Sequence, residues 1–156
     1  MQPCAGKLLI NTTPNDPNFN NAVIFIAEYN ARGALGLIIN QQFERPLNAL
    51  AEYSHCPSFP LYMGGPVDNE HLYFIHSRAD LIPGGTLVSN DIYFGGDFAM
   101  AITHISQQRI DERFIKICIG YCCWDTGELE AEIAAGGWRL EEGNAELIFS
   151  GSFEGT

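Results

Sequence analysis

Two apolar runs joined by a short link constrain the fold of this chain more than any other feature. Residues 22–29 read AVIFIAEY and residues 34–40 read ALGLIIN, and the four residues NARG between them include a glycine. Runs rich in β-branched residues on either side of a short glycine-containing link are typical of a β-hairpin. Because the hydrophobicity of both runs is continuous rather than alternating, we expect strands that are covered on both faces, at the centre of the core.

Local patterns indicate further strands. GKLLIN at residues 6–11 is a short apolar run, and the loop TTPNDPNFNN follows it. FPLYM and HLYFIH, at residues 59–63 and 71–76, flank the turn GGPVDN, whose glycines, proline and asparagine favour a change of direction. RFIKICIG at residues 113–120 alternates isoleucines with other residues, as expected of a strand with two unlike faces.

Three short helices complete the expected fold. PLNALAEY places Pro46 at a first helical position and has leucines at helical spacing. A second helix begins after the N-cap residue Asp97, and His104 falls outside its apolar stripe. That stripe consists of Phe98, Ala101, Ile102 and Ile105. GELEAEIAAGG predicts a third helix that ends at the paired glycines. The sequence has no internal repeat and no long linker, so we expect one α+β domain over residues 1–156.

The composition sets the class of protein. A chain of 156 residues with 46% hydrophobic and 17% charged residues is typical of a globular protein with its own core. Its apolar runs are far shorter than the ~20 residues that a membrane-spanning helix needs. The N-terminal segment MQPCAGKLLIN lacks the basic region, long apolar core and cleavage site of a secretory signal. We therefore expect a cytoplasmic protein that makes no membrane contact.

The charge balance disfavours direct binding to nucleic acid. The formal net charge is −11 and the pI is about 4.5, whereas binding to nucleic acid depends mainly on clustered lysines and arginines. The eight basic residues are scattered along the sequence. A patch formed in space by Arg109, Arg113 and Lys116 is the one arrangement that the sequence leaves open.

The segment GYCCWDTGELEAEIAAGGW, residues 120–138, holds two of the five cysteines and both tryptophans. An odd number of cysteines at irregular spacing disfavours a disulfide framework. Cys122 and Cys123 are adjacent, whereas a redox dithiol uses Cys-x-x-Cys, and no histidine pair completes a zinc site with Cys118 and Cys122. A thiol nucleophile would need a base such as His76. We expect small buried thiols, with no metal and no cofactor.

The acidic residues of this segment remain as candidates. In the helix expected after Gly127, Glu128 lies in the first turn, where a carboxylate interacts favourably with the helix dipole. Glu130 and Glu132 flank the buried stripe of the helix on opposite sides. A capped, solvated helix and a functional helix both fit this pattern. Acid–base chemistry would require a second group in a pocket, which the sequence does not locate.

Several segments occur in a specific order along the chain: GKLLIN, NDPNFNNAVIFIAEYNARGALGLIIN, YMGGPV, the dipeptide HS, and GYCCWDTGELEAEI followed by GGW. Their order and spacing resemble those of the YqgE/AlgH family of bacterial proteins over essentially the whole chain. The matched positions are Asp16, Pro17 and Phe19, then Gly33, Ala34, Gly36, Leu37 and Asn40, then Gly64, Gly65, Pro66 and Val67, and last Gly120, Tyr121, Trp124, Gly127, Leu129 and Glu130.

The sequence departs from this family pattern at three places. Cys123 stands where the family has glycine, Glu128 where it usually has glutamine, and Gln41 where arginine often follows the asparagine. A family that uses no cysteine at these positions does not depend on a thiol there. The resemblance therefore agrees with thiols that have no catalytic role, and Glu128 puts in question any role that needs a neutral amide.

The resemblance implies an α+β fold in which a bent mixed β-sheet forms a pseudo-barrel and a few short helices pack outside. It implies no established biochemical activity. Some members of the family carry the label of a transcriptional regulator, and this label implies no DNA-binding motif.

We expect a non-catalytic binding or regulatory protein whose functional surface is built by the GGPV turn and the GYCCWDTGELE segment. Glycines, a proline and aromatic residues concentrate there, where a partner can approach the backbone closely. The partner would be a protein or a small molecule. The candidate surface comprises Asn40, Gly64, Gly65, Pro66, His76, Gly120, Tyr121, Trp124, Gly127, Glu128 and Glu130. We assign no catalytic residue.

Two other classes of function stay open. A hydrolase-like enzyme would use Glu128, Glu130 or His76 as acid–base groups, and it would need a concave pocket that holds at least two of them. A transcription factor that binds DNA directly is the least favoured class, because the chain is strongly acidic.

Overall fold

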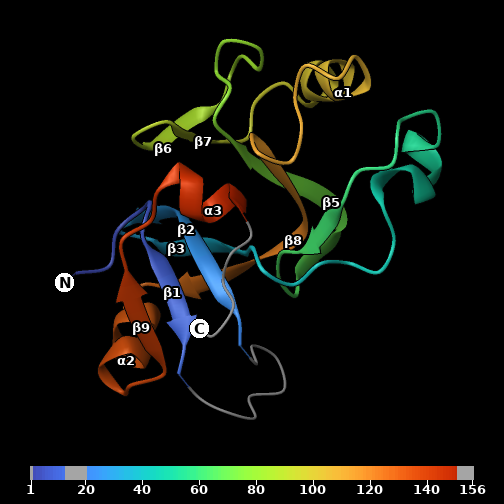
Figure 1. Ribbon diagram of the computed structural model, residues 1–156. Coiled ribbons are helices and arrows are strands. Elements are labelled where there is room, and N and C mark those ends of the chain that lie inside the picture. The colour runs from blue at the N-terminus through green and yellow to red at the C-terminus, as the bar shows by residue number, and fades with distance from the viewer. Residues whose placement is uncertain (1, 13–20, 151–156) are drawn as a thin grey trace.

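A computed structural model describes residues 2–12 and 21–150. The family motif at residues 16–19 lies outside the described residues, as does most of the loop expected around it. One nine-stranded sheet has the order β6-β7-β5-β8-β3-β2-β1-β9, with β4 paired to β8 off this path (Figure 1). The strands are β1 (Leu8–Asn11), β2 (Val23–Asn30), β3 (Gly33–Ile38), β4 (Leu61–Met63), β5 (Val67–His76), β6 (Thr86–Ser89), β7 (Ile92–Phe94), β8 (Ile115–Asp125) and β9 (Trp138–Glu141).

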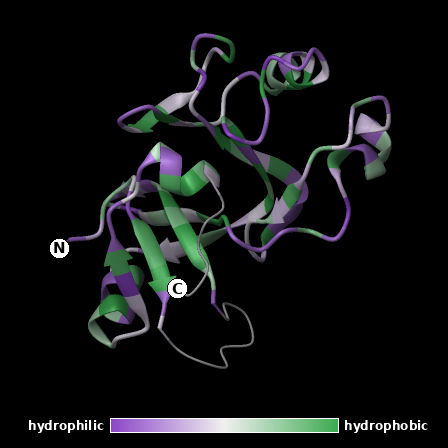
Figure 2. Cartoon of the chain, in the orientation of Figure 1, coloured by the Kyte–Doolittle hydropathy of each residue, from purple (hydrophilic) through white to green (hydrophobic). Residues whose placement is uncertain are grey.

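The predicted hairpin is confirmed. β2 and β3 pair antiparallel, and successive side chains of β2 enter two different core clusters. Val23 and Phe25 face one cluster, Ile24 and Ile26 face the other, and all four are fully buried. Figure 2 shows β1 and β2 coloured as hydrophobic over most of their length. The continuous apolar run therefore reflects a strand that is buried on both faces.

β8 connects the two halves of the sheet. Its first part pairs antiparallel with β5 and parallel with β4, and its second part pairs antiparallel with β3. Gly120 separates the two parts with a φ of +72°. Cys118 and Tyr121 pack in one cluster, while Cys122 already faces another, so the alternation of side chains shifts by one residue at the glycine. The predicted strand at residues 113–120 is the first part of this longer strand.

The helices of the described chain cover different parts of the sheet (Figure 1). They are α1 (Phe98–Ser106), α2 (Glu128–Ala134) and α3 (Ala145–Ser150), with two 3-10 turns, η1 (Leu47–Ala49) and η2 (Ala51–Tyr53). Ala101 and Ile105 of α1 pack with Ile117 of β8. Leu129 of α2 packs with the tryptophans, and Phe149 of α3 packs in the cluster that contains Phe25. No helix among the described residues is long and apolar enough to cross a membrane.

The α+β class, the mixed sheet and the short helices agree with the expected fold. Over the described residues, the strand path has two ends, β6 and β9, so the pseudo-barrel is not a closed barrel. Asp97 caps α1 as predicted, because its side chain accepts a hydrogen bond from the Met100 amide.

One local helix prediction was wrong. The segment after Pro46 forms η1 and η2 rather than one α-helix, because Leu50 has extended backbone angles and interrupts it. His104 is buried, although it lies outside the apolar stripe of α1. The chain after the helix folds back over this histidine, and the amides of Arg109 and Ile110 both donate to its carbonyl oxygen.

Candidate functional site

The GGPV turn packs directly against β8. The Gly64 amide donates to the Ile119 carbonyl at 2.8 Å, and the Gly64 carbonyl accepts from the Ile38 amide at 2.9 Å. A Cβ atom on Gly65 would lie 2.2 Å from the backbone carbon of Tyr121. Glycine is therefore required at position 65, because two backbones approach each other with no room for a side chain.

Gly120 completes this close contact from the side of β8. A Cβ atom at this position would lie 2.5 Å from Nδ2 of Asn69, and the same Nδ2 donates to the Gly65 carbonyl at 2.7 Å. The next residue, Tyr121, packs edge-on against the ring of Tyr73, with the centroids 5.1 Å apart. Five predicted site residues thus meet at one place. They are Gly64, Gly65, Pro66, Gly120 and Tyr121.

A second group of predicted residues lies around α2. The Trp124 indole donates to Oε1 of Glu132 at 3.2 Å, and the Trp138 indole donates to the same oxygen at 2.8 Å. The two rings are edge to face, with the centroids 6.3 Å apart, and both residues are buried. Sequence reasoning treated Glu132 only as a flanking acid, yet this carboxylate holds both tryptophans of the chain.

Replacing Glu132 with alanine is expected to lower the free energy of unfolding by about 1–3 kcal/mol. Two buried indole N–H groups would lose their acceptor, and such groups are costly when left unpaired. Glu132→Gln keeps an acceptor oxygen and should restore most of the loss. Urea denaturation of the three proteins measures the effect, and equal midpoints for Glu132→Ala and wild type would show that the two hydrogen bonds contribute nothing.

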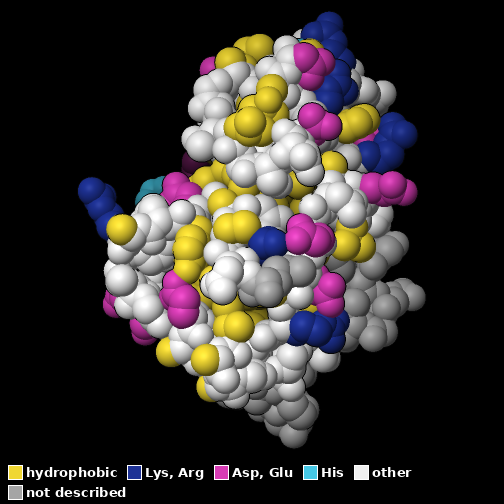
Figure 3. Space-filling model, turned by 90° about the vertical axis from the view of Figure 1, so that its left-hand side faces the viewer, with side chains coloured by type: hydrophobic (Ala, Val, Ile, Leu, Met, Phe, Trp, Pro, Cys, Tyr) yellow, Lys and Arg dark blue, Asp and Glu magenta, His cyan; other side chains and the backbone are white. Residues whose placement is uncertain are grey.

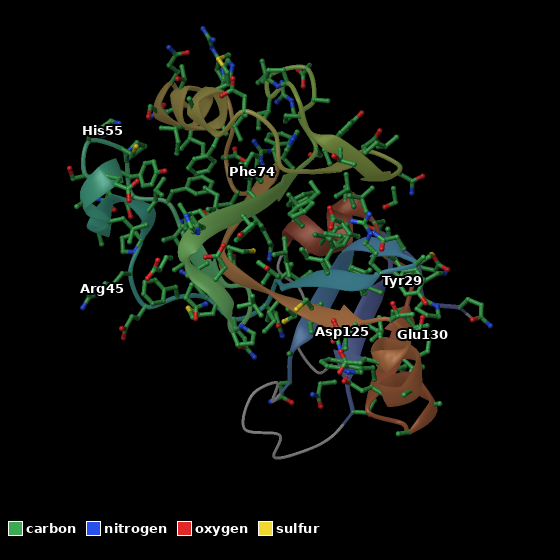
Figure 4. The ribbon with its side chains drawn as sticks, turned by 180° about the vertical axis from the view of Figure 1, so that it is seen from behind. Tyr29, Arg45, His55, Phe74, Asp125 and Glu130 are labelled. Carbon is green, nitrogen blue, oxygen red and sulfur yellow. The ribbon has the colours of Figure 1, made fainter. Side chains whose placement is uncertain are left out.

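The other acids of α2 also contact their own chain. Glu128 accepts a hydrogen bond from the Asp125 amide at 2.5 Å, and Glu130 accepts one from the Tyr29 hydroxyl. Figure 4 shows Tyr29, Asp125 and Glu130 close together beside α2, with Phe74 in the other half of the molecule. Gly127, with a φ of +84°, makes the turn into the helix. Glu130 fastens α2 to β2 of the hairpin, whereas Glu128 and Gly127 shape the turn between β8 and α2.

His76 lies apart from both groups. Its side chain is fully buried between the rings of Phe74 and Tyr93, at centroid distances of 5.7 and 5.5 Å. Nε2 donates to the Gly95 carbonyl at 3.1 Å, and Nδ1 accepts from the Arg78 amide at 3.1 Å. Burial lowers the pKa of this imidazole, against an opposing effect of the Gly95 hydrogen bond. His76 is a neutral core residue with both nitrogens engaged.

The side chain of Asn40 is hydrogen-bonded to the backbone at the start of β2. Its side-chain oxygen accepts from the Val23 amide at 2.9 Å, and its Nδ2 donates to the Asn21 carbonyl at 2.8 Å. The amide group therefore substitutes for a missing backbone partner at the point where the chain enters the sheet. The predicted site residues accordingly fall into two groups and two separate positions, Asn40 and His76. The GGPV group is Gly64, Gly65, Pro66, Gly120 and Tyr121, and the α2 group is Trp124, Gly127, Glu128 and Glu130.

The Cys118 and Cys122 thiols are buried, which disfavours their reactive thiolate form. Cys122 and Cys123 point to opposite faces of β8, so the first is buried and the second is exposed. Burial raises the pKa of Cys118 and of Cys122 to about 12. The Cys122 Sγ contacts the Gly64 carbonyl at 3.6 Å. Among the described residues, no group of three or more His, Cys, Asp or Glu side chains is placed to hold a metal ion.

A groove of about 510 Å³ lies beside the GGPV group. We call it the β5 groove, because one wall comes from β5 and the opposite wall from the segment that contains η2. Asn69, which bridges Gly65 and Gly120, is part of the β5 wall. The lining residues are Leu50, Ala51, Glu52, Tyr53, Asn69, Glu70, His71, Leu72, Phe98 and Ile119. The close glycine contact thus positions one wall of a cavity that is large enough for a ligand.

An acid–histidine–tyrosine cluster adjoins this wall. Asp68 has a φ of +55° and accepts hydrogen bonds from the Tyr73 hydroxyl and from Nδ1 of His71, the latter at 2.7 Å. These bonds lower the pKa of the Asp68 carboxyl, and the tyrosine contributes more than the histidine. In return, the carboxylate raises the pKa of exposed His71 and that of Tyr73, the latter to about 12. Sequence reasoning missed this cluster, although VDNEHLY places the three side chains within six residues.

Lys116 is a buried cation in β8, only 3% exposed. Its Nζ donates to the Ile39 carbonyl at 2.7 Å and lies 4.3 Å from the centroid of the Tyr62 ring. Burial lowers its pKa to about 8. Lys116 therefore takes no part in a surface patch with Arg109 and Arg113. On the face shown in Figure 3, Lys and Arg side chains are interleaved with Asp and Glu side chains.

Comparisons with known proteins confirm the resemblance seen in the sequence. A family model described as AlgH-like matches residues 8–156. A UPF0301 protein of Chlorobium phaeobacteroides is 34% identical, and the alignment covers 96% of this chain and 81% of that protein. A UPF0301 protein of Bacteroides thetaiotaomicron is 33% identical, with 94% and 76% covered.

Solved structures share the fold. The solution structure of the AlgH protein from Pseudomonas aeruginosa has a TM-score of 0.72 and 25% identity, covering 96% of this chain and 85% of that one. A crystal structure of a Corynebacterium diphtheriae protein has a TM-score of 0.77 at 18% identity, covering 96% and 81%, which shows similarity of fold alone. From the family match over nearly the whole sequence, together with these relatives, we conclude that this chain belongs to the AlgH-like family.

Proposed function

We propose that this protein is a non-catalytic binding protein of the cytoplasm, and that its partner occupies the β5 groove. The observation that carries this proposal is the close packing of the glycine turn against β8. Gly65 and Gly120 allow Asn69 to bridge the two backbones, and Asn69 forms part of the groove wall. Gly65 and Gly120, two of the residues that the sequence singled out, therefore act on the groove by positioning Asn69 in its wall.

The arrangement of the acid–base candidates supports binding rather than catalysis. His76 is buried with both ring nitrogens engaged. Glu128 and Glu130 hold α2 to neighbouring segments. None of these three side chains is among those that line the β5 groove. The hydrolase-like alternative, which needs at least two of them in one pocket, receives no support from this geometry.

A regulatory role would follow from binding a partner, without direct contact with DNA. The net charge of −11 gives a long-range repulsion from phosphate groups. Lys116, one of the eight basic residues, is buried in the core. We therefore propose that any effect of this protein on transcription passes through the molecule held in the β5 groove.

Site-specific photo-crosslinking in the native host tests the proposal. A benzophenone amino acid placed at Glu52 or Glu70, on the two walls of the β5 groove, is expected to yield an adduct of defined mass. The same amino acid at exposed Glu28 or Glu146, which do not line the groove, should yield none. Mass spectrometry of the purified adducts gives the identity of the partner.

A groove-filling variant is the second arm of this experiment. Ala51→Trp places an indole at an exposed lining position and should abolish the adducts while circular dichroism stays unchanged. The proposal would be wrong if the groove positions gave no adduct, or if the same adducts formed at the control positions or persisted in Ala51→Trp.

A further inference from the structure

The chemistry of the β5 groove points to the class of its occupant. We infer that the groove binds a protein segment that carries both Lys or Arg side chains and apolar side chains. This inference rests on the proposed function and specifies the partner.

Part of the groove lining is apolar and aromatic. Leu50, Leu72 and Ile119 contribute aliphatic surface. The rings of Tyr53 and Phe98 pack edge to face, with the centroids 5.6 Å apart, and both belong to the lining. Such a surface gains from covering by apolar side chains, and the aromatic faces also attract cations.

The charged groups along the groove are acidic. Glu52 lies on one wall and Glu70 on the other, both are exposed, and no Lys or Arg belongs to the described lining. His71 is the single residue of the lining that can carry a positive charge, and its Nδ1 is paired with Asp68. The pKa of His71 is raised mainly by Asp68 and to a smaller extent by Glu70 and Glu52.

The exposed glutamates favour a cationic occupant, and the apolar lining residues favour a segment with apolar side chains over a small cation. A free ammonium ion or polyamine would satisfy the glutamates but leave the leucine, isoleucine and ring surfaces exposed to water. A cavity of about 510 Å³ has the size of a site for several side chains. An acidic segment or a phosphate-rich ligand would meet two carboxylates of like charge.

Nuclear magnetic resonance with three peptides tests the inference. The ¹⁵N-labelled protein is titrated with acetyl-Arg-Leu-Arg-Leu-Arg-Leu-amide, with the analogue that has glutamate for arginine, and with the analogue that has serine for leucine. The first peptide is expected to shift the amide signals of the groove lining, whereas the acidic analogue should not bind. The serine analogue should bind about tenfold more weakly, because it cannot cover the apolar residues of the groove lining.

Charge variants complete the experiment. Glu52→Gln with Glu70→Gln should weaken binding of the Arg-Leu peptide about three- to tenfold, since an exposed ion pair contributes modestly. Glu28→Gln, an exposed acid outside the groove, should leave the affinity unchanged. Raising the salt concentration should weaken binding to wild type and should affect the double variant less.

The inference is overturned if the Arg-Leu peptide does not bind, if its shifts lie away from the groove, or if the acidic analogue binds equally well. It is also overturned if spermidine alone reproduces the shifts at equal concentration. These results are separate from the crosslinking test. If adducts form at Glu52 and Glu70 but the peptide does not bind, the groove is a binding site and its occupant is not cationic. If no adducts form at these positions, the groove is not the binding site.

Discussion

Replacing Gly65 with alanine is expected to lower the free energy of unfolding by about 3–5 kcal/mol, the range of severe core disruption. The new methyl group would lie 2.2 Å from the Tyr121 carbonyl carbon and 2.3 Å from its oxygen. These are backbone atoms in the middle of β8, which is paired with other strands, so they cannot move aside as a flexible side chain could. The turn would have to separate from the strand.

Gly127→Ala is the matched control for this substitution. Gly127 has a φ of +84° but no atom within 4 Å of the position of a Cβ, so alanine there should cost only the ~1–2 kcal/mol of a left-handed backbone. Thermal and urea denaturation of the three proteins measures the difference. Equal losses for the two variants would mean that the contact with Tyr121 adds no large cost at position 65, where the backbone itself is not left-handed.

Because of Lys116, the free energy of unfolding is expected to increase with pH in the alkaline range. The pKa of its ammonium group is lowered by burial to about 8, from an ordinary value of 10.5. Below pH 8 the lysine is protonated in both states, and the full desolvation cost is present. Between pH 8 and 10.5 the unfolded chain binds more protons than the folded chain, so the free energy of unfolding increases with pH. The lowered pKa of Lys116 accounts for a total increase of about 3 kcal/mol in the free energy of unfolding over this pH range.

Comparison with Lys116→Met isolates this contribution. Titration of the thiols and tyrosines in the unfolded chain is common to both proteins and cancels in the difference between the two free energies of unfolding. In the folded protein, Cys118 beside Lys116 has a pKa of about 12 and stays protonated below pH 10.5. That difference, wild type minus variant, is expected to increase by about 3 kcal/mol between pH 7 and 10.5. The loss of the hydrogen bond to Ile39 adds a constant offset but no slope. A difference that stays flat with pH would contradict a lowered pKa for Lys116.

The sequence predicts those parts of the fold whose signals are local. The β2–β3 hairpin has two apolar runs and a glycine-containing link, and α1 has a capping residue and a stripe. The predicted end of the strand at Gly120 was wrong, because a glycine that follows alternating residues is typical of a strand end. Here its left-handed backbone lets β8 continue with its faces exchanged. β6 and β7, with four and three residues, are too short to show a periodic pattern.

The candidate site could be predicted only in part. The GGPV turn and Gly120 belong together, and the motif order of the family indicated both segments without showing their contact. The β5 groove has lining residues from four separate stretches of the chain, at positions 50–53, 69–72, 98 and 119. Glu132 gains its role because Trp124 and Trp138 meet on the same side of α2. Such tertiary contacts leave no periodic signal in the sequence.

The late position of β8 in the chain has a consequence for synthesis on the ribosome. Its partners β3, β4 and β5 are complete by residue 76, but they have no common neighbour until residue 125 has been made. During this interval the apolar β2–β3 hairpin has an unpaired edge that other nascent chains could join. A product cut short before residue 125 would thus be an aggregation-prone fragment rather than a smaller folded protein, and the cell must shield the hairpin until the C-terminal strands emerge.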